Sequence, residues 1–236
     1  MDSRAKCFAS RVQPKDVKAA LVTCGGLCPG LNSIIRGLTN CLWHQYGVRN
    51  IIGIASGYNG LACPGRHPPI QLTPDVVREI HRKGGSILKA GRGGFEATRT
   101  CNTLEVLGIS MLFVIGGDGT QSAAHLLYEE ARRRDLCVSV VGVPKSIDND
   151  ILFIDRTFGF NSAVAAAASV ISNAWVEATS SERGVGIVKL MGRDAGFIAV
   201  DAALASNLVD LVLIPEVHVE LDECACPNAR APMRMP

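Results

Sequence analysis

Residues 111–120 read MLFVIGGDGT. The first half of this stretch is an unbroken apolar run, which is typical of a strand buried on both faces of a parallel sheet. The second half is a glycine-rich turn around a single aspartate, and it leads into a segment with helical spacing. A strand, a glycine turn and a helix in this order predict an α/β fold that can bind phosphate at the helix N-terminus.

Similar apolar runs recur along the chain and alternate with helical segments. Helical spacing extends over residues 31–42 and 161–179, and the Thr73-Pro74-Asp75 start signal with the Gly84-Gly85 stop predicts a third helix. The alternation predicts a mainly parallel, doubly wound sheet with ligands at the carboxyl ends of its strands. Further strands are expected at 19–23, 50–54, 137–143, 185–190 and 209–214.

The composition narrows the class of partner. Of 236 residues, 24 are basic and 22 acidic, so no broad field favours nucleic acid or an anionic membrane. The most apolar region, 195–214, contains Asp201 and Asp210, and residues 1–18 lack a secretion signal. The nine cysteines are scattered, which indicates reduced thiols. We expect a cytoplasmic protein that binds neither nucleic acid nor membrane.

The first predicted strand runs into CGGLCPGLN, residues 24–32. Its glycines allow the backbone to approach a ligand, and the following helix points N–H groups at an anion. The segment matches neither the P-loop nor the dinucleotide fingerprint. A tight strand-to-helix turn without a ligand remains the alternative.

The loop in residues 116–120 carries Asp118 beside free helix N–H groups. A carboxylate at such a position can hold Mg²⁺ that bridges phosphate oxygens while the bare backbone contacts the rest of the group. The alternative interpretation is that Asp118 only caps the helix.

The segment KSIDND, residues 145–150, follows the next strand and should lie beside the Asp118 loop. One of its carboxylates could accept the proton of an attacking hydroxyl, and Lys145 could balance phosphate charge. The alternative is a turn in which Asp and Asn bond their own backbone. Two arginines in glycine-containing loops, Arg92 and Arg193, add groups suited to phosphate.

Together these segments resemble the phosphofructokinase family, across about residues 17–220. The matching motifs, in family order, are CGGLCPGLN, GYNGL, ILKAGRGGF, VIGGDGTQ, VGVPKSIDND, TFGFNSAV, MGRDAG and LIPEV. The first of them, with the lysine before SIDND, resembles the plant-type and trypanosomatid-like ATP-dependent branch, which is similar to the pyrophosphate-dependent enzymes.

The resemblance implies a role for individual residues. Asp118 would bind Mg²⁺, and Asp148 would be the base that takes the proton from the sugar hydroxyl. The nucleotide would contact Gly26, Arg92, Gly93, Gly117, Asp118, Gly119 and Thr120. Fructose 6-phosphate would contact Ser146, Ile147, Asp148, Met191, Gly192 and Arg193.

The implied activity is ATP-dependent 6-phosphofructokinase of glycolysis. Gly119 leaves room for a nucleotide α-phosphate where pyrophosphate-dependent enzymes usually have Asp, whereas Lys145 is typical of those enzymes, so a pyrophosphate donor is the alternative. GGDGT also occurs in the NAD kinase and diacylglycerol kinase superfamily, but those folds lack SIDND and MGR at these spacings. A non-catalytic or regulatory subunit is a further alternative.

The resemblance implies two Rossmann-like three-layer domains with mainly parallel sheets, the second incomplete. We expect an extension over 1–17, a nucleotide-binding domain over 18–160, a partial sugar-phosphate domain over 161–223 and a disordered tail over 224–236. Family sugar-phosphate residues have no match in that tail, so we expect a truncated chain with little kinase activity alone. It would form a homo-oligomer or associate with full-length paralogues, and a plastid location is possible if a transit segment is missing.

Overall fold

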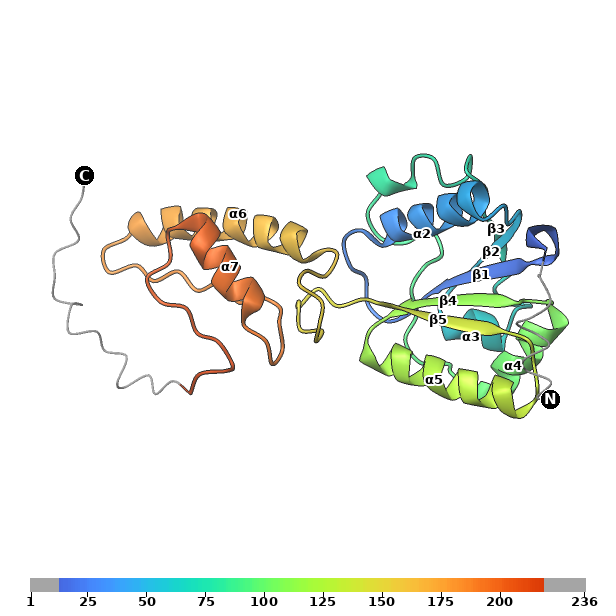
Figure 1. The fold of residues 1–236 in the computed structure, drawn as a ribbon. Coiled ribbons are helices and arrows are strands. Elements are labelled where there is room, and N and C mark those ends of the chain that lie inside the picture. The colour runs from blue at the N-terminus through green and yellow to red at the C-terminus, as the bar shows by residue number, and fades with distance from the viewer. Residues whose placement is uncertain (1–12, 219–236) are drawn as a thin grey trace. The chain divides into compact units, whose positions relative to one another are not determined.

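The computed structural model describes residues 13–218 (Figure 1). The chain divides into two compact units, Met1–Ile147 and Asp148–Pro236. The predicted extension over 1–17 lies partly, and the predicted tail over 224–236 entirely, outside the described residues. The functional domain bounds 18–160 and 161–223 therefore stay a prediction beside this observed division.

The first unit contains one sheet with the strand order β3-β2-β1-β4-β5. All neighbouring strands are parallel except the pair of β2 and β3. The predicted α/β class and mainly parallel sheet are thus confirmed here. The strands are β1 (Lys18–Thr23), β2 (Asn50–Ile54), β3 (Ile70–Gln71), β4 (Met111–Gly116) and β5 (Ser139–Pro144).

Helices cover both faces of this sheet (Figure 1). The helix after β1 lies on one face and the helix after β4 on the other, so the connections change direction between these two adjacent strands. In doubly wound sheets, ligands bind at such a switch point. The helical elements are η1 (Pro14–Asp16), α2 (Leu31–Asn40), the π-helical turn η2 (Cys41–Gln45), α3 (Tyr58–Ala62), η3 (Ile80–Arg82), α4 (Ala97–Val106) and α5 (Asp118–Arg133).

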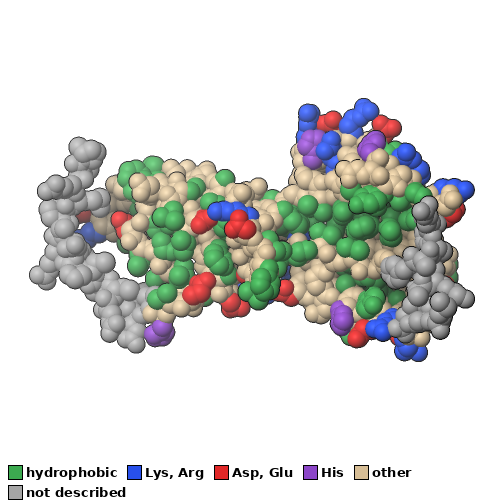
Figure 2. Space-filling view, viewed as in Figure 1, with side chains coloured by type: hydrophobic (Ala, Val, Ile, Leu, Met, Phe, Trp, Pro, Cys, Tyr) green, Lys and Arg blue, Asp and Glu red, His purple; other side chains and the backbone are tan. Residues whose placement is uncertain are grey.

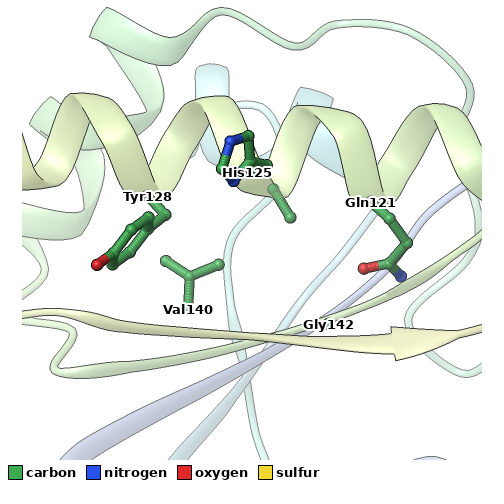
Figure 3. Close-up of a pocket in the computed structure, with 6 residues that line it drawn as sticks. Gln121, His125, Tyr128, Val140 and Gly142 are labelled. Atoms are coloured by element: carbon green, nitrogen blue, oxygen red, sulfur yellow. The ribbon is translucent and has the colours of Figure 1, made fainter.

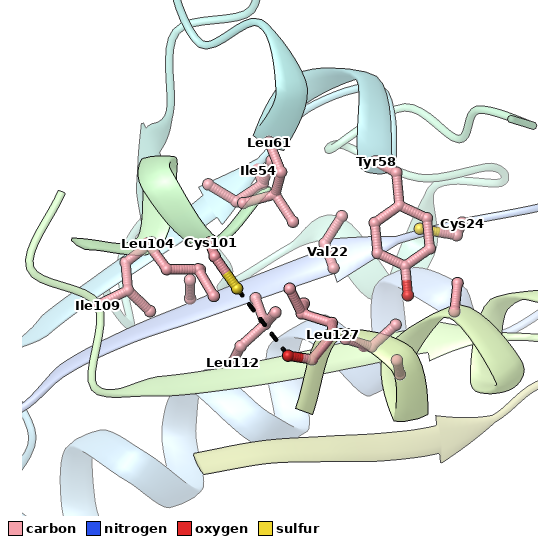
Figure 4. Close-up of a cluster of buried hydrophobic side chains, with 14 of the residues drawn as sticks. Val22, Cys24, Ile54, Tyr58, Leu61, Cys101, Leu104, Ile109, Leu112 and Leu127 are labelled. Atoms are coloured by element: carbon pink, nitrogen blue, oxygen red, sulfur yellow. Dashed lines mark hydrogen bonds between the residues drawn. The ribbon is translucent and has the colours of Figure 1, made fainter. Parts of the chain in front are cut away.

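One hydrophobic core lies between the sheet and the helices α3, α4 and α5 (Figure 4). Val22 of the central strand and Leu112 of β4 meet Leu104 and Leu127 there, and all four are fully buried. Residues of β1 that alternate with this set, such as Leu21, are equally buried and point to the opposite face. Burial on both faces explains why residues 19–22 of this strand are all apolar.

The second unit contains α6 (Phe160–Thr179) and α7 (Phe197–Ser206). The helix predicted over 161–179 is confirmed, but the strands predicted over 185–190 and 209–214 are not formed. Among the described residues of this unit no sheet is present, because a strand needs a hydrogen-bonded neighbour and neither segment has one.

Parts of both segments nevertheless keep the alternation of a strand. Exposed and partly buried side chains alternate over residues 187–190 and 211–214. Val188 and Leu190, together with Leu208, pack against the small core of α6 and α7. Figure 2 shows hydrophobic side chains at the surface of this unit. We call the outward residues the exposed row; they are Val185, Ile187, Val209, Leu211 and Leu213.

Two other expectations need correction. The helix predicted from Thr73 to Gly85 is a series of turns that ends in η3. Thr73 Oγ1 does accept the N–H of Val76, at 3.3 Å, but in residues 73–85 only Val77 and Ile80 are buried, which is too small an apolar face for a packed helix. Among the described cysteines, Cys24, Cys28, Cys41, Cys63 and Cys101 form no disulfide, as expected, whereas Cys137 is disulfide-bonded.

Within residues 13–218 no helix combines the length and apolar character that a membrane span requires.

Candidate active site

The predicted site residues of the first unit lie at one edge of its sheet. Because β1, β4 and β5 are parallel, their carboxyl ends meet there. Two backbone hydrogen bonds join the chain at these ends: the N–H of Cys24 donates to the carbonyl of Ile115 at 2.8 Å, and that of Lys145 donates to the carbonyl of Gly116 at 2.9 Å. The three loops predicted to be neighbours are therefore neighbours.

A fourth loop docks on the first. The N–H of Gly25 donates to the carbonyl of Gly91 at 2.9 Å. A Cβ on Gly26 would lie 3.3 Å from Nη2 of Arg92, so a side chain at residue 26 would press against the guanidinium. Gly93 has a φ of +72°, which favours glycine, and open space where a Cβ would be. Gly26, Arg92 and Gly93 thus come together, as the sequence predicts.

The loop after β4 presents an open backbone. Gly117 is the N-cap of α5 in an extended conformation, and Asp118 is the first helical residue, exposed to solvent. No side chain makes a capping hydrogen bond at this helix start, so the interpretation of Asp118 as the cap is not supported. A Cβ on Gly119 would meet no atom within 4 Å. Asp118 and Gly119 are both exposed, and the space at Gly119 is open to a ligand.

Lys145 brings a cation to the same edge. Its side chain is buried, with 9% of the residue exposed, and its Nζ lies 3.6 Å from where a Cβ of Gly25 would be. Among the described residues, no carboxylate forms an ion pair with it. Burying an ammonium without a counter-charge is unfavourable, so this position suits an anionic ligand.

The thiol of Cys24 lies close to this cation but is not a nucleophile. Burial raises the pKa of Cys24 to about 12, and the charge of Lys145 only partly opposes that rise. A thiol with such a pKa stays protonated near neutral pH. The buried cysteine therefore acts as a small apolar side chain of the core.

Two residues that sequence reasoning did not assign support the loop after β4. The Tyr58 hydroxyl donates to the carbonyl of Thr120 at 2.9 Å. The side-chain amide of Gln121 donates to the carbonyls of Gly116 and Val143. Tyr58 belongs to the GYNGL motif, but its contact spans 62 positions of sequence, which no local pattern reveals.

The remaining predicted residues follow in the chain. Ser146 and Ile147 end the first unit, and Asp148 opens the second. Asp148 is buried, with 7% exposed. Next to it, Asn149 has a φ of +58° and accepts the N–H of Thr157 at 2.7 Å. The side chain of Asn149 thus bonds backbone groups of Asp155 and Thr157, six and eight positions further on, and shapes the loop after Asp148 instead of closing the local turn of the alternative interpretation.

The MGR segment, residues 191–193, belongs to the second unit. Met191 and Arg193 are exposed, and Gly192 between them is buried. The N–H of Ala195 donates to the carbonyl of Gly192 at 2.8 Å, which closes a turn just before α7. A Cβ on Gly192 would overlap the carbonyl of Ala195, so this tight turn requires glycine.

A separate groove of about 310 Å³ lies between α5 and β5 (Figure 3). It is lined by His125, Tyr128 and Val140 among others, and it shares only Gln121 with the loops described above. Its lining contains no carboxylate and no lysine or arginine. We therefore assign the candidate site to the loops and not to this groove.

Comparison with known proteins gives the family context. The ATP-dependent 6-phosphofructokinase of Borreliella burgdorferi is 49% identical over 209 residues, which is 89% of this chain and 47% of that protein. The chloroplastic ATP-dependent 6-phosphofructokinase 5 of Arabidopsis thaliana is 50% identical over 209 residues, 89% of this chain and 38% of that protein. The chain thus spans less than half the length of these two relatives.

Solved structures agree. The crystal structure of Pichia pastoris phosphofructokinase in the T-state superposes with a TM-score of 0.74 at 26% identity, covering 86% of this chain and 24% of that one. A sequence profile described as phosphofructokinase matches residues 18–230. Since this match covers most of the chain and includes every loop described above, the chain belongs to the phosphofructokinase family.

Proposed function

We propose that this chain carries the donor site and part of the sugar-phosphate site of an ATP-dependent 6-phosphofructokinase, which phosphorylates fructose 6-phosphate to fructose 1,6-bisphosphate. The observation that carries the proposal is the pairing of two features: Lys145 is a buried cation that forms no ion pair with a carboxylate in residues 13–218, and the backbone at Gly119 is open. A polyphosphate fits this combination, because it supplies the missing negative charge and needs room beside a helix N-terminus.

Mg²⁺ fits the residues present. Among the described residues no cluster of three metal-ligating side chains exists, so the protein would offer Asp118 as a single carboxylate. Mg²⁺ in phosphate sites is commonly held by one or two carboxylates together with substrate phosphates and water. When bound, the ion neutralises charge on the transferred group. Asp118, at the exposed start of α5, is the residue that would hold it.

The donor-binding residues of this chain would divide the work. Gly26, Gly93, Gly117 and Gly119 let the backbone approach the phosphates, and the Arg92 guanidinium and Lys145 ammonium balance their charge. Thr120 would contact the nucleotide from the same open start of α5. The free space at Gly119 favours a nucleotide over pyrophosphate, because an α-phosphate would occupy the place that a side chain would fill.

The residues proposed for the acceptor side come from the end of the first unit and from the second unit. Asp148 would take the proton of the sugar 1-hydroxyl, while Ser146, Ile147, Met191, Gly192 and Arg193 would contact the sugar phosphate. A positioned base of this kind contributes about 10²–10⁴-fold to a rate. Made in a full-length version of the protein, Asp148→Asn should therefore lower turnover by about that factor and leave nucleotide affinity unchanged. Asp155→Asn, at an exposed aspartate of the same segment, should change neither.

Binding of Mg·AMP-PNP, measured by titration calorimetry, tests the donor site. We expect Gly119→Asp and Lys145→Met each to weaken binding at least tenfold, whereas Gly65→Asp serves as the matched control. Gly65 also has open space around its Cβ position, but it lies outside the loops. Equal affinity in wild type and Gly119→Asp would refute the assignment. Tighter binding of pyrophosphate than of Mg·AMP-PNP would favour the pyrophosphate-dependent alternative.

Location in the cytoplasm and assembly into an oligomer belong to the same proposal. Both can be tested by cell fractionation and by light scattering of the purified chain. The chloroplast location named for the Arabidopsis relative is a property of that protein.

A further inference from the structure

Gln121 occupies an unusual place for a glutamine in a helix. It lies in the first turn of α5, three positions after Asp118, and its side chain points toward β5 instead of solvent (Figure 3). Its Nε2 donates to the carbonyl of Gly116 at 2.9 Å and to that of Val143 at 3.1 Å. These two residues are near the ends of β4 and β5. One side chain thus links the helix to both strand ends.

The two linked carbonyls precede the two charged groups of the donor site. Gly116 comes just before the loop that carries Asp118, and Val143 comes two positions before Lys145. The carbonyl of Gly116 also accepts the N–H of Lys145 at 2.9 Å. The amide of Gln121 therefore completes a small network in which the starts of both loops are held to each other.

A glycine on β5 makes room for this network. A Cβ on Gly142 would overlap Oε1 of Gln121. The same loop is held from its other side, where the Tyr58 hydroxyl donates to the carbonyl of Thr120. Gln121 and Gly142 fit each other as a pair, and no local pattern in the sequence connects them.

We propose that Gln121 is a positioning residue for phosphoryl-donor binding. Resting on the proposed function, the inference is that its amide fixes the Asp118 carboxylate relative to the Lys145 ammonium, so that both meet the same polyphosphate. Gln121 does not touch the nucleotide itself. The adenosine part would bind without this constraint, whereas the Mg²⁺-bearing β- and γ-phosphates would depend on it.

Two substitutions test the proposal in different ways. Gln121→Glu keeps the shape but removes the donor and sets a carboxylate against two carbonyls. Gly142→Ala keeps Gln121 itself but displaces its side chain, because the added methyl group would overlap Oε1. His125→Gln is the matched control, because His125 lies one turn further along α5, lines the same groove and is mostly exposed. Circular dichroism and melting curves establish that each variant is folded.

Affinities for two ligands separate positioning from general damage. We expect Gln121→Glu and Gly142→Ala to weaken Mg·AMP-PNP binding about tenfold, because each variant loses the hydrogen bonds that hold the two loops together. The affinity for AMP should stay unchanged. His125→Gln should bind both ligands as the wild type does. Equal loss of both ligands would show a merely structural role and overturn the inference, as would unchanged Mg·AMP-PNP binding.

Amide hydrogen exchange of the ligand-free chain keeps this result distinct from the proposed function. Exchange in residues 116–121 and 143–147 should be faster in Gln121→Glu than in wild type and His125→Gln. If the wild type binds no nucleotide, the proposed function fails, yet faster exchange in Gln121→Glu would still support Gln121 as the residue that holds the two loops. Equal exchange in all variants would overturn that as well.

Discussion

Replacing Tyr58 by Phe removes one hydroxyl from the protein and nothing else. That hydroxyl donates to the carbonyl of Thr120 at 2.9 Å, and only 4% of Tyr58 is exposed. The ring stays in place, because its edge-on contact with Phe95, at 4.9 Å between centroids, does not need the oxygen. Burial also raises the pKa of Tyr58, so the hydroxyl remains a donor throughout the neutral range.

The expected cost follows from this geometry. A net hydrogen bond is worth about 1 kcal/mol, and the carbonyl of Thr120 loses one partner. Since Thr120 is only partly buried, water can reach part of its surroundings, which keeps the cost well below the roughly 3 kcal/mol of a fully stranded group. For a chain of this size, about 1 kcal/mol lowers the melting temperature by roughly 2–4 °C.

Urea unfolding followed by tryptophan fluorescence measures this cost. A Trp175→Phe background leaves Trp43 as the single tryptophan, which belongs to the first unit. Tyr128→Phe is the control, because Tyr128 is 44% exposed and lines the groove between α5 and β5. If Tyr58→Phe and Tyr128→Phe unfold at the same urea concentration, the hydroxyl does not hold the loop and the reasoning is wrong.

Three further predictions concern pH and surface. Burial raises the pKa of Cys24 from 9.0 to about 12, so the stability that comes from its neutral thiol is lost as pH rises from about 9 to about 12. Over that range the free energy of unfolding should fall less in Cys24→Ala than in the control Cys63→Ala, because the thiol of Cys63 is exposed. Hydrogen bonds from two arginines lower the pKa of Glu130 from 4.5 to about 2, so its contribution to the free energy of unfolding is complete above pH 4.5 and is lost toward pH 2. Between these pH values the free energy of unfolding should fall less steeply in Glu130→Gln than in wild type, and an unchanged curve would contradict this. Val185 and Ile187 are 82% and 88% exposed, so the chain should bind the dye ANS. The double variant Val185→Thr, Ile187→Thr should reduce the fluorescence of bound ANS, and equal fluorescence would show that these residues are covered.

The sheet of the first unit could largely be predicted from the sequence, because β1, β2 and β4 are largely buried on both faces. Such strands show as unbroken apolar runs, and the run at residues 50–54 coincides with β2. The antiparallel strand β3 is too short to leave a pattern. The run at 185–190 shows the opposite limit. Its apolar, β-branched residues predict a strand, but strand pairing depends on a neighbour that the pattern does not contain.

The candidate site divides in the same way. Glycines at strand ends mark the loops, and Asp118, Arg92 and Lys145 could be selected because a carboxylate suits Mg²⁺ and cationic groups suit phosphate. The burial of Lys145 and the contacts of Tyr58 and Gln121 could not be predicted, since they depend on segments far apart in the sequence. Local signals indicate which groups are present, and tertiary contacts decide how they are held.

The central place of β1 has a consequence for biosynthesis. The strand is made first, and it pairs on one side with β2, which follows soon after, and on the other with β4, which ends at Gly116. At about 5–20 residues per second, the ribosome takes roughly 3–12 s to travel from β2 to β4. During that interval one apolar edge of the nascent sheet stays open, so a chaperone at the exit tunnel would have its main task in this window.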